Sequence, residues 1–151
     1  MQTEETAIPA KAQYNILLAD DCLDIVQIVK LYINDPRIRL TVCTNGLEAV
    51  QAFKQASFDL VLMDIQMPVL DGCAATLSIR HWEVQHKLPP TPITALTASS
   101  TASDLAKIFK AGCTNYLPKP ITKPILLQTV NQFFGLRPKA PAAEVALALH
   151  S

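Results

Sequence analysis

Three acidic residues follow apolar segments of the chain, where buried strands are expected to end. Asp20 and Asp21 come directly after the run 14–19, and Asp64 follows the run 60–63. In open parallel α/β sheets, ligands bind in the crevice beyond the carboxyl ends of the strands. Carboxylates there suit Mg²⁺, which prefers oxygen ligands. Asp64 is also a candidate nucleophile, since aspartate can form acyl phosphates.

A hydroxyl and an ammonium follow two further apolar segments. Thr97 ends the run 93–96, and Lys119 follows the run 115–117 and lies between two prolines. An ammonium can pair with a carboxylate and then with a phosphoryl oxygen, to which a hydroxyl can also donate. The set of side chains therefore indicates a site for a divalent cation and a phosphoryl group.

Each of these residues also has a purely structural interpretation. Acids at a strand-to-helix turn can cap the helix, an isolated loop lysine is commonly solvated, and threonine is common at strand ends. Tyr116 equally fits a packed aromatic at a strand edge. A lone acid pair would favour capping, and it is Asp64 at the end of a neighbouring strand that favours the metal site.

Composition restricts the class of protein. The chain has 151 residues, of which 50% are hydrophobic and 17% are charged, as expected for one compact domain. The net charge of zero favours neither nucleic acid nor a membrane surface as partner, and no apolar run reaches membrane-spanning length. We expect a cytoplasmic protein with free thiols, since its start has no leader-like pattern and its cysteines and histidines show no metal-ligand spacing.

Short apolar strands alternate with amphipathic segments, which predicts an α/β fold with a parallel sheet covered on both faces. The expected helices lie at about 22–34, after Asn45-Gly46, from Asp71-Gly72 to about 87, at 101–111 and at 122–134. The expected core positions are, helix by helix, Ile25, Ile28, Val29 and Tyr32; Leu47, Val50 and Phe53; Leu105, Ile108 and Phe109; and Leu126, Val130 and Phe134. Gly112 suits the left-handed residue after a helix. Residues 1–12 are expected to be a flexible lead-in, and 136–151 a linker-like tail.

Four motifs, in this order, resemble those of the receiver domain of two-component response regulators, the CheY-like superfamily. They are Leu17–Asp21, Met63–Pro68 with Asp71-Gly72, Ala95–Ala98 and Tyr116–Pro120. The resemblance covers residues 13–135 and implies a single doubly wound, flavodoxin-like sheet of five strands in the order 2-1-3-4-5, flanked by five helices. The stretches 79–83 and 88–93 are similar to receivers of hybrid sensor histidine kinases.

The resemblance implies that Asp64 accepts the phosphoryl group. Asp20, Asp21, Asp64 and the backbone carbonyl of Gln66 would hold Mg²⁺, for which Mn²⁺ could substitute. The chain would catalyse its own phosphorylation and slow dephosphorylation, without being a multiple-turnover enzyme. The implied donor is a phosphohistidine of a sensor histidine kinase or of a histidine phosphotransfer protein.

The resemblance also implies a switch. Lys119 would neutralise the phosphoryl group, Thr97 would turn towards it, and Tyr116 would follow as a rotameric switch. The surface of the helix 101–111, the strand 115–117 and the helix 122–134 would then change, and it would also be available for a homodimer. The Lys119-Pro120 peptide bond is often cis in the family.

The chain departs from the family in one place. Hybrid-kinase receivers usually follow the acid pair with Asn-x-x-Asn, and Cys22 and Ile25 hold those positions here. This departure leaves the identity of the partner open. The pathway, the phosphoryl lifetime and whether the chain stands alone or is part of a longer kinase are open as well.

Two other functions use the same residues. A phosphatase of the haloacid-dehalogenase type needs a second acid two residues after the nucleophile, where this chain has Gln66, and it needs a cap domain. A pseudo-receiver acts without phosphorylation and generally lacks one or more of the five site residues. Multiple turnover of a phosphate ester would identify the first, and an absent response to Mg²⁺ would favour the second.

Overall fold

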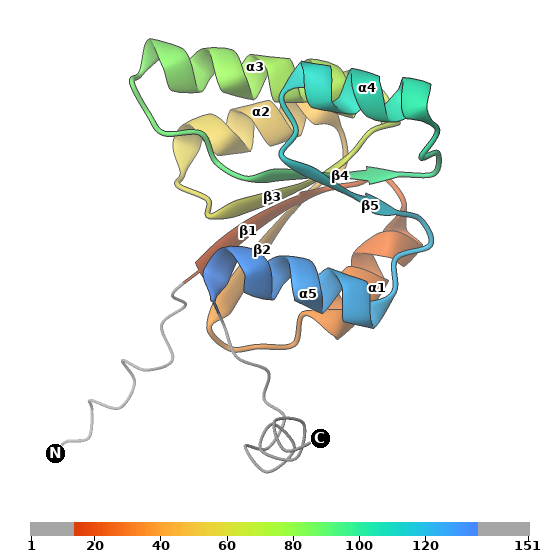
Figure 1. Ribbon diagram of the computed structural model, residues 1–151. Helices are drawn as coiled ribbons and strands as arrows, with labels where there is room; N and C mark the ends of the chain where they lie inside the picture. The colour runs from red at the N-terminus through yellow and green to blue at the C-terminus, as the bar shows by residue number, and fades with distance from the viewer. Residues whose placement is uncertain (1–13, 136–151) are drawn as a thin grey trace, which may run out of the picture.

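A parallel sheet in the order β2-β1-β3-β4-β5 runs through residues 14–135, the part of the chain that the structure, a computed structural model, describes (Figure 1). The strands are β1 (Tyr14–Ala19), β2 (Ile38–Cys43), β3 (Leu60–Asp64), β4 (Ile93–Thr97) and β5 (Asn115–Pro118). The helices are α1 (Leu23–Tyr32), α2 (Gly46–Gln55), α3 (Gly72–Gln85), α4 (Ala102–Ala111) and α5 (Lys123–Phe134). The predicted alternation and the implied strand order are both confirmed. The predicted lead-in and tail lie outside the described residues.

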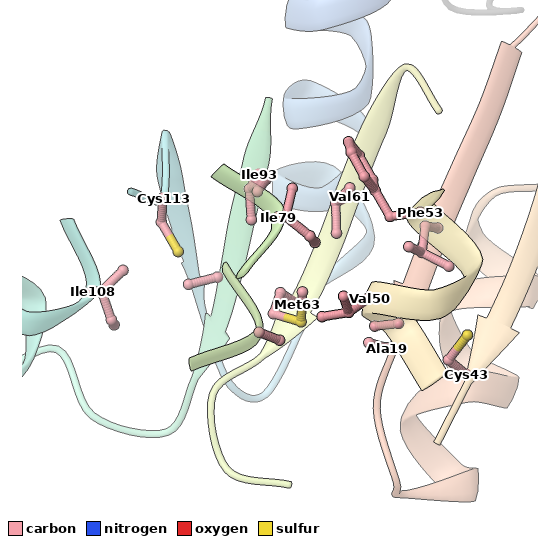
Figure 2. Close-up of a cluster of buried hydrophobic side chains, with 14 residues drawn as sticks. Ala19, Cys43, Val50, Phe53, Val61, Met63, Ile79, Ile93, Ile108 and Cys113 are labelled. Atoms are coloured by element: carbon pink, nitrogen blue, oxygen red, sulfur yellow. The ribbon is translucent and has the colours of Figure 1, made fainter. Parts of the chain in front are cut away.

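Helices cover both faces of the sheet: α2, α3 and α4 lie on one face, and α1 and α5 lie on the other (Figure 1). Because side chains alternate along a strand, Val61 and Met63 of β3 join the core under α2, α3 and α4, which Figure 2 shows. Leu60 and Leu62 join the core under α1 and α5. This two-sided burial explains why the strands read as continuous apolar runs. Among the described residues, no helix has the length and hydropathy of a membrane span.

The helices do not bury all the residues that their periodicity predicts. In α1 the buried positions are Val26 and Val29, whereas Ile25 is only half-buried. Leu47 of α2 and Phe109 of α4 were expected in the core, but they are 46% and 43% exposed. Periodicity locates an apolar stripe on a helix, but packing against the sheet decides how far that stripe is turned.

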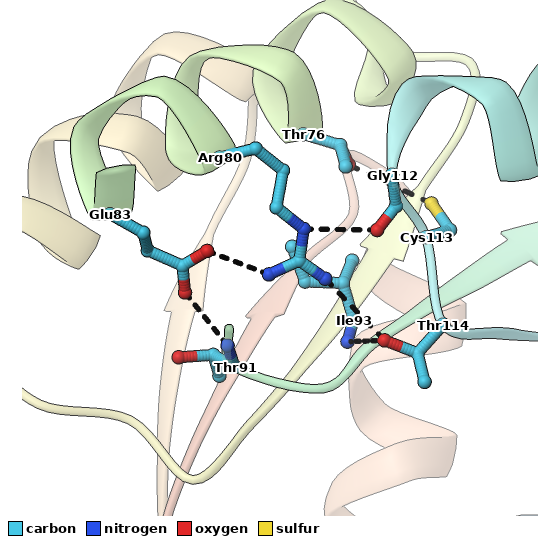
Figure 3. A network of polar contacts seen from close by, with 8 residues as sticks. All are labelled: Thr76, Arg80, Glu83, Thr91, Ile93, Gly112, Cys113 and Thr114. Atoms are coloured by element: carbon cyan, nitrogen blue, oxygen red, sulfur yellow. Dashed lines mark hydrogen bonds and ion pairs between the residues drawn. The ribbon is translucent and has the colours of Figure 1, made fainter. Parts of the chain in front are cut away.

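A polar network ties α3 to the start of β4 and to the loop after α4 (Figure 3). Arg80 donates to the carbonyl of Gly112 at 3.0 Å and to Oε1 of Glu83 at 2.8 Å. Oε2 of Glu83, which is 2% exposed, accepts from the N–H of Thr91 at 2.7 Å. Gly112 has a φ of 112°, which confirms it as the left-handed residue that ends α4.

Candidate phosphoryl and metal site

The parallel register places the site acids at one edge of the sheet. Ala19 of β1 pairs with Met63 of β3, and each of them directly precedes a site acid, Asp20 or Asp64. Asp20 is fully buried and Asp64 is 3% exposed, while Asp21 is exposed. Carboxylate oxygens of the three acids lie within 4.8 Å of one another. The structure therefore brings together the three acids that the sequence analysis grouped as a candidate metal site.

The same register brings in the hydroxyl and the ammonium. Thr97 of β4 pairs with Pro118 of β5, the residue before Lys119. The N–H of Lys119 donates to the carbonyl of Thr97 at 2.8 Å, which fixes the two backbones side by side. The Lys119-Pro120 peptide bond is cis, as the resemblance implied.

Helix capping does not explain the acid pair. The N-cap residue of α1 is Cys22, and no side chain caps this helix. Asp20 accepts from the N–H of Cys22 through Oδ1, at 2.9 Å, which is a turn contact before the helix. Asp71, by contrast, does cap a helix. It is the N-cap residue of α3, and its carboxylate accepts from the N–H of Ala74 at 2.8 Å.

One oxygen of the acid cluster has no hydrogen bond. Oδ2 of Asp20 is buried and accepts none from the described residues, and its cation neighbour is the Nζ of Lys119 at 3.5 Å, which is longer than an ordinary hydrogen bond. A buried carboxylate oxygen without a hydrogen bond is costly, and a second buried carboxylate nearby adds repulsion that one lysine only partly offsets. A hard divalent cation with oxygen ligands relieves both costs, so the donor set of Asp20, Asp21 and Asp64 fits Mg²⁺.

Lys119 reaches into this cluster instead of lying solvated in a loop. Its Nζ is 3.0 Å from Oδ1 of Asp64 and 3.5 Å from Oδ2 of Asp20. Burial acts to lower the pKa of Lys119, but the hydrogen bond to Asp64 and the charge of Asp20 outweigh it and raise that pKa. Lys119 is therefore an ammonium at neutral pH.

Asp64 is held in an unusual electrostatic environment. Burial raises its pKa to about 6, the hydrogen bond from Lys119 opposes this rise, and the charge of Asp20 adds to it. Oδ1 of Asp64 also accepts from the N–H of Gln66, at 3.3 Å. A carboxylate whose pKa is shifted by burial and by a specific charged partner is typical of a functional site.

A cavity of about 140 Å³ lies over this carboxylate. Its lining includes Asp64, Thr97 and Lys119, together with Gln66, but neither Asp20 nor Asp21. Tyr116 is not part of the lining either, and its half-buried ring packs edge-on against Phe109, with 6.2 Å between ring centroids. The cavity is of a size for a small anion, and of the three acids only Asp64 lines it.

Gly72 lets the start of α3 approach the strand that carries Asp64. Its N–H donates to the carbonyl of Ile65 at 2.9 Å, and a Cβ at this position would lie 2.1 Å from the carbonyl oxygen of Asp64. The Asp71-Gly72 pair thus caps α3 and fixes it against the backbone of the site.

The sequence analysis missed the two charged residues of α4 that line the cavity, Asp104 and Lys107. The carboxylate of Asp104 accepts hydrogen bonds from the hydroxyls of Ser99 and Thr101. The sequence does contain a signal, since threonine followed three residues later by an acid is typical of a helix start. That signal predicts a helix start but not that the loop after β4 folds back onto the site.

The fold and site have known counterparts. The sequence model described as "Response regulator receiver domain" matches residues 16–131. The sensor protein GacS of Pseudomonas syringae pv. syringae is 38% identical over 129 residues, which are 85% of this chain but only 14% of that relative.

Two solved structures share the fold. The receiver domain of the Saccharomyces cerevisiae response regulator Ssk1, crystallised with the histidine phosphotransfer protein Ypd1, has a TM-score of 0.76 and 31% identity, covering 81% of this chain and 89% of that one. The receiver domain of the sensor histidine kinase PA1611 of Pseudomonas aeruginosa PAO1, with a magnesium ion coordinated in its active-site cleft, has a TM-score of 0.72 and 31% identity, covering 83% and 100%.

Proposed function

The chain belongs to the response regulator receiver family, and from this premise we propose that Asp64 accepts a phosphoryl group from a phosphohistidine of a partner protein. The single observation that carries the proposal is the cavity lined by Asp64, Thr97 and Lys119, in which the ammonium of Lys119 donates to the carboxylate of Asp64 at 3.0 Å. The partner would be a sensor histidine kinase or a histidine phosphotransfer protein. The Ypd1–Ssk1 receiver complex supports this class of partner.

In the proposed reaction, a carboxylate oxygen of Asp64 attacks phosphorus in line with the P–N bond of the phosphohistidine. The new O–P bond forms as the P–N bond breaks, and the imidazole nitrogen keeps that electron pair and takes up a proton. Lys119 would offset charge on the phosphoryl oxygens, and the buried site would supply the positioning. Mg²⁺ held by Asp20, Asp21, Asp64 and the carbonyl of Gln66 would supply further charge neutralisation. Mn²⁺ would fit the same oxygen donors.

After transfer, the phosphoryl group would offer new acceptors to the residues around it. Lys119 keeps its position as an ammonium partner, and Thr97 gains an acceptor for its hydroxyl hydrogen. The ring of Tyr116 packs against the partly exposed Phe109, so a change at Thr97 that moved Tyr116 would reach the surface of α4, β5 and α5. This surface would carry the output, and it is also where two copies would pair.

Intact mass spectrometry tests the proposal directly. With Mg²⁺ and acetyl phosphate, the wild-type chain should gain the mass of one phosphoryl group, and Asp64→Asn should gain none. Asp59→Asn is the matched control, because Asp59 is an exposed acid in the same segment whose carboxylate accepts from the N–H of Asn15, away from the cavity lining. Equal labelling of Asp64→Asn and wild type would contradict the proposal. Many turnovers of phosphate release per chain would favour a phosphatase instead.

A further inference from the structure

The loop between β4 and α4 is held by one carboxylate in the first turn of α4. Oδ2 of Asp104 accepts from the hydroxyl of Ser99 and, at 3.1 Å, from that of Thr101. These two hydrogen bonds lower the pKa of Asp104, so it is ionised at neutral pH. Asp104 thus fixes the position of Ser99 through a charge-assisted hydrogen bond.

Ser99 in turn occupies the hydroxyl of Thr97. Thr97 donates through Oγ1 to the carbonyl of Ser99 at 2.8 Å, and Oγ1 accepts from the N–H of Ser99 at 3.1 Å. A threonine hydroxyl has a single hydrogen to donate. Thr97 therefore cannot donate to a group on Asp64 until it gives up the carbonyl of Ser99.

Asp104 also lies at the cavity itself. It lines the same 140 Å³ cavity as Asp64 and Lys119, and so does Lys107. Among the described residues, no lysine, arginine or histidine forms an ion pair with Asp104. The charge of Lys107 helps to lower the pKa of Asp104 and so offsets part of its negative charge. The role of Asp104 therefore follows from its hydrogen bonds and not from repulsion of a phosphoryl group.

We propose that Asp104 is a positioning residue that, through Ser99, holds the Thr97 hydroxyl in the arrangement of the unphosphorylated chain and so opposes phosphorylation. The proposal rests on the proposed function of Asp64. It adds that hydrogen bonds already present in the unphosphorylated chain make phosphorylation less favourable. On phosphorylation, Thr97 has to give up its hydrogen bond to the carbonyl of Ser99. The hydrogen bond between Ser99 and Asp104 holds Ser99 in place and makes this loss less favourable. Weakening the Ser99–Asp104 hydrogen bond should therefore shift the chain towards the phosphorylated arrangement.

The test compares Asp104→Asn, which keeps the size but removes the charge, with Ser99→Ala, which removes the hydroxyl and keeps every charge. The probe is beryllofluoride, a phosphoryl mimic, titrated at saturating Mg²⁺ and followed by NMR of the backbone amides. Both variants should bind it about fivefold more tightly than wild type, as the loss of one ordinary hydrogen bond predicts. Both should also be phosphorylated faster by acetyl phosphate.

Glu48→Gln is the matched control. Glu48 lies in the first turn of α2 and accepts from the hydroxyl and the N–H of Thr44, but it does not line the cavity. Its removal should change neither beryllofluoride affinity nor phosphorylation rate. The dissociation constant of Mg²⁺ alone should be the same in all three variants, because none of them alters the three-acid cluster.

A second background separates positioning from a merely structural role. Thr97→Val has no hydroxyl at position 97, so the hydrogen bond to Ser99 that the proposal invokes is absent. In this background Ser99→Ala should no longer change the affinity for beryllofluoride. An equal gain from Ser99→Ala in both backgrounds, or unchanged or weaker binding in Asp104→Asn and Ser99→Ala, would overturn the proposal. If the wild-type chain itself takes up neither beryllofluoride nor a phosphoryl group, the proposed function of Asp64 fails first and this inference fails with it.

Discussion

Lys119 and Asp64 are 55 positions apart in the chain, yet the Nζ of Lys119 lies 3.0 Å from Oδ1 of Asp64. The same ammonium is 3.5 Å from Asp20. One cation thus faces a cluster of three carboxylates, and the metal-free site retains negative charge. Its affinity for Mg²⁺ and its reactivity towards phosphoryl donors should therefore respond to Lys119 in opposite directions.

Lys119→Met should slow phosphorylation by acetyl phosphate by about 100-fold, because removal of one preorganised charge donor typically has an effect of this size. It should also tighten Mg²⁺ binding, since the ammonium that repels the metal is gone. Mass spectrometry and a Mg²⁺ titration by calorimetry measure the two effects. Lys123→Met is the control, an exposed lysine at the start of α5 outside the cavity lining. A loss of both Mg²⁺ affinity and phosphorylation would indicate damage to the fold instead.

Mg²⁺ should stabilise the wild-type chain and fail to stabilise Asp20→Asn. A ligand present at 100 times its dissociation constant adds about 2.7 kcal/mol, which for a domain of this size raises Tm by roughly 10 °C. Thermal melts with Mg²⁺ and with EDTA measure the difference. Asp71→Asn should keep the full response, because Asn also caps a helix and Asp71 is not part of the three-acid cluster. An undiminished response of Asp20→Asn to Mg²⁺ would contradict the assigned ligand set.

The sequence predicted this site well because its residues lie at strand ends. In a parallel sheet, the ends of neighbouring strands meet at one edge, so Asp20, Asp64, Thr97 and Lys119 could be grouped from their positions alone. The element bounds were also predicted closely, because buried strands and helix caps leave clear local signals. The roles carried over from the family, including those of Gln66 and Tyr116, stay predictions.

The sequence predicted the side-chain arrangement around the site less well. Leu47 and Phe109 belong to apolar stripes but are exposed, because the tilt of a helix on the sheet is a tertiary property. Asp104 looked like an ordinary acid of a helix start, and only the folded loop shows that it reaches Ser99 and the cavity. Contacts between neighbouring loops depend on backbone paths that no periodic pattern encodes.

The pKa of Asp64 predicts how pH affects stability without metal. Its ordinary value of 3.8 rises to about 6 in the folded chain, so between these values the folded state holds a proton that the unfolded state has lost. The free energy of unfolding should therefore fall as pH rises through this range, by roughly 2–3 kcal/mol. Asp64→Asn should lack this loss, so its advantage over wild type in EDTA should grow between pH 4 and 7. Denaturant unfolding at several pH values measures both free energies of unfolding. A difference between Asp64→Asn and wild type that stays constant with pH would contradict the raised pKa of Asp64.

Arg80 and Glu83 form the polar network of α3 away from the site (Figure 3). The side chain of Arg80 is 20% exposed and that of Glu83 is 3% exposed. Glu83 also accepts from the N–H of Thr91. Glu83→Ala leaves Arg80 without its anion and the Thr91 N–H without its acceptor. It should therefore lower the free energy of unfolding by about 3–5 kcal/mol, the range for breaking a buried pair from one side.

The exposed pair of Arg37 and Asp35 provides the control for Glu83. Its ion pair is 2.6 Å long, but the Arg37 side chain is 40% exposed, so Arg37→Met should cost no more than about 1 kcal/mol. The double variant Arg80→Met with Glu83→Leu should cost less than Glu83→Ala, because it removes both charges together. Denaturant unfolding of the variants measures these free energies. It shows whether the contribution of an ion pair follows its burial or the distance between its charged atoms. If Glu83→Ala costs no more than Arg37→Met, the network does not fix α3 to β4 and its loop. If it does cost more while Mg²⁺ affinity stays unchanged, the network stabilises the fold independently of the site.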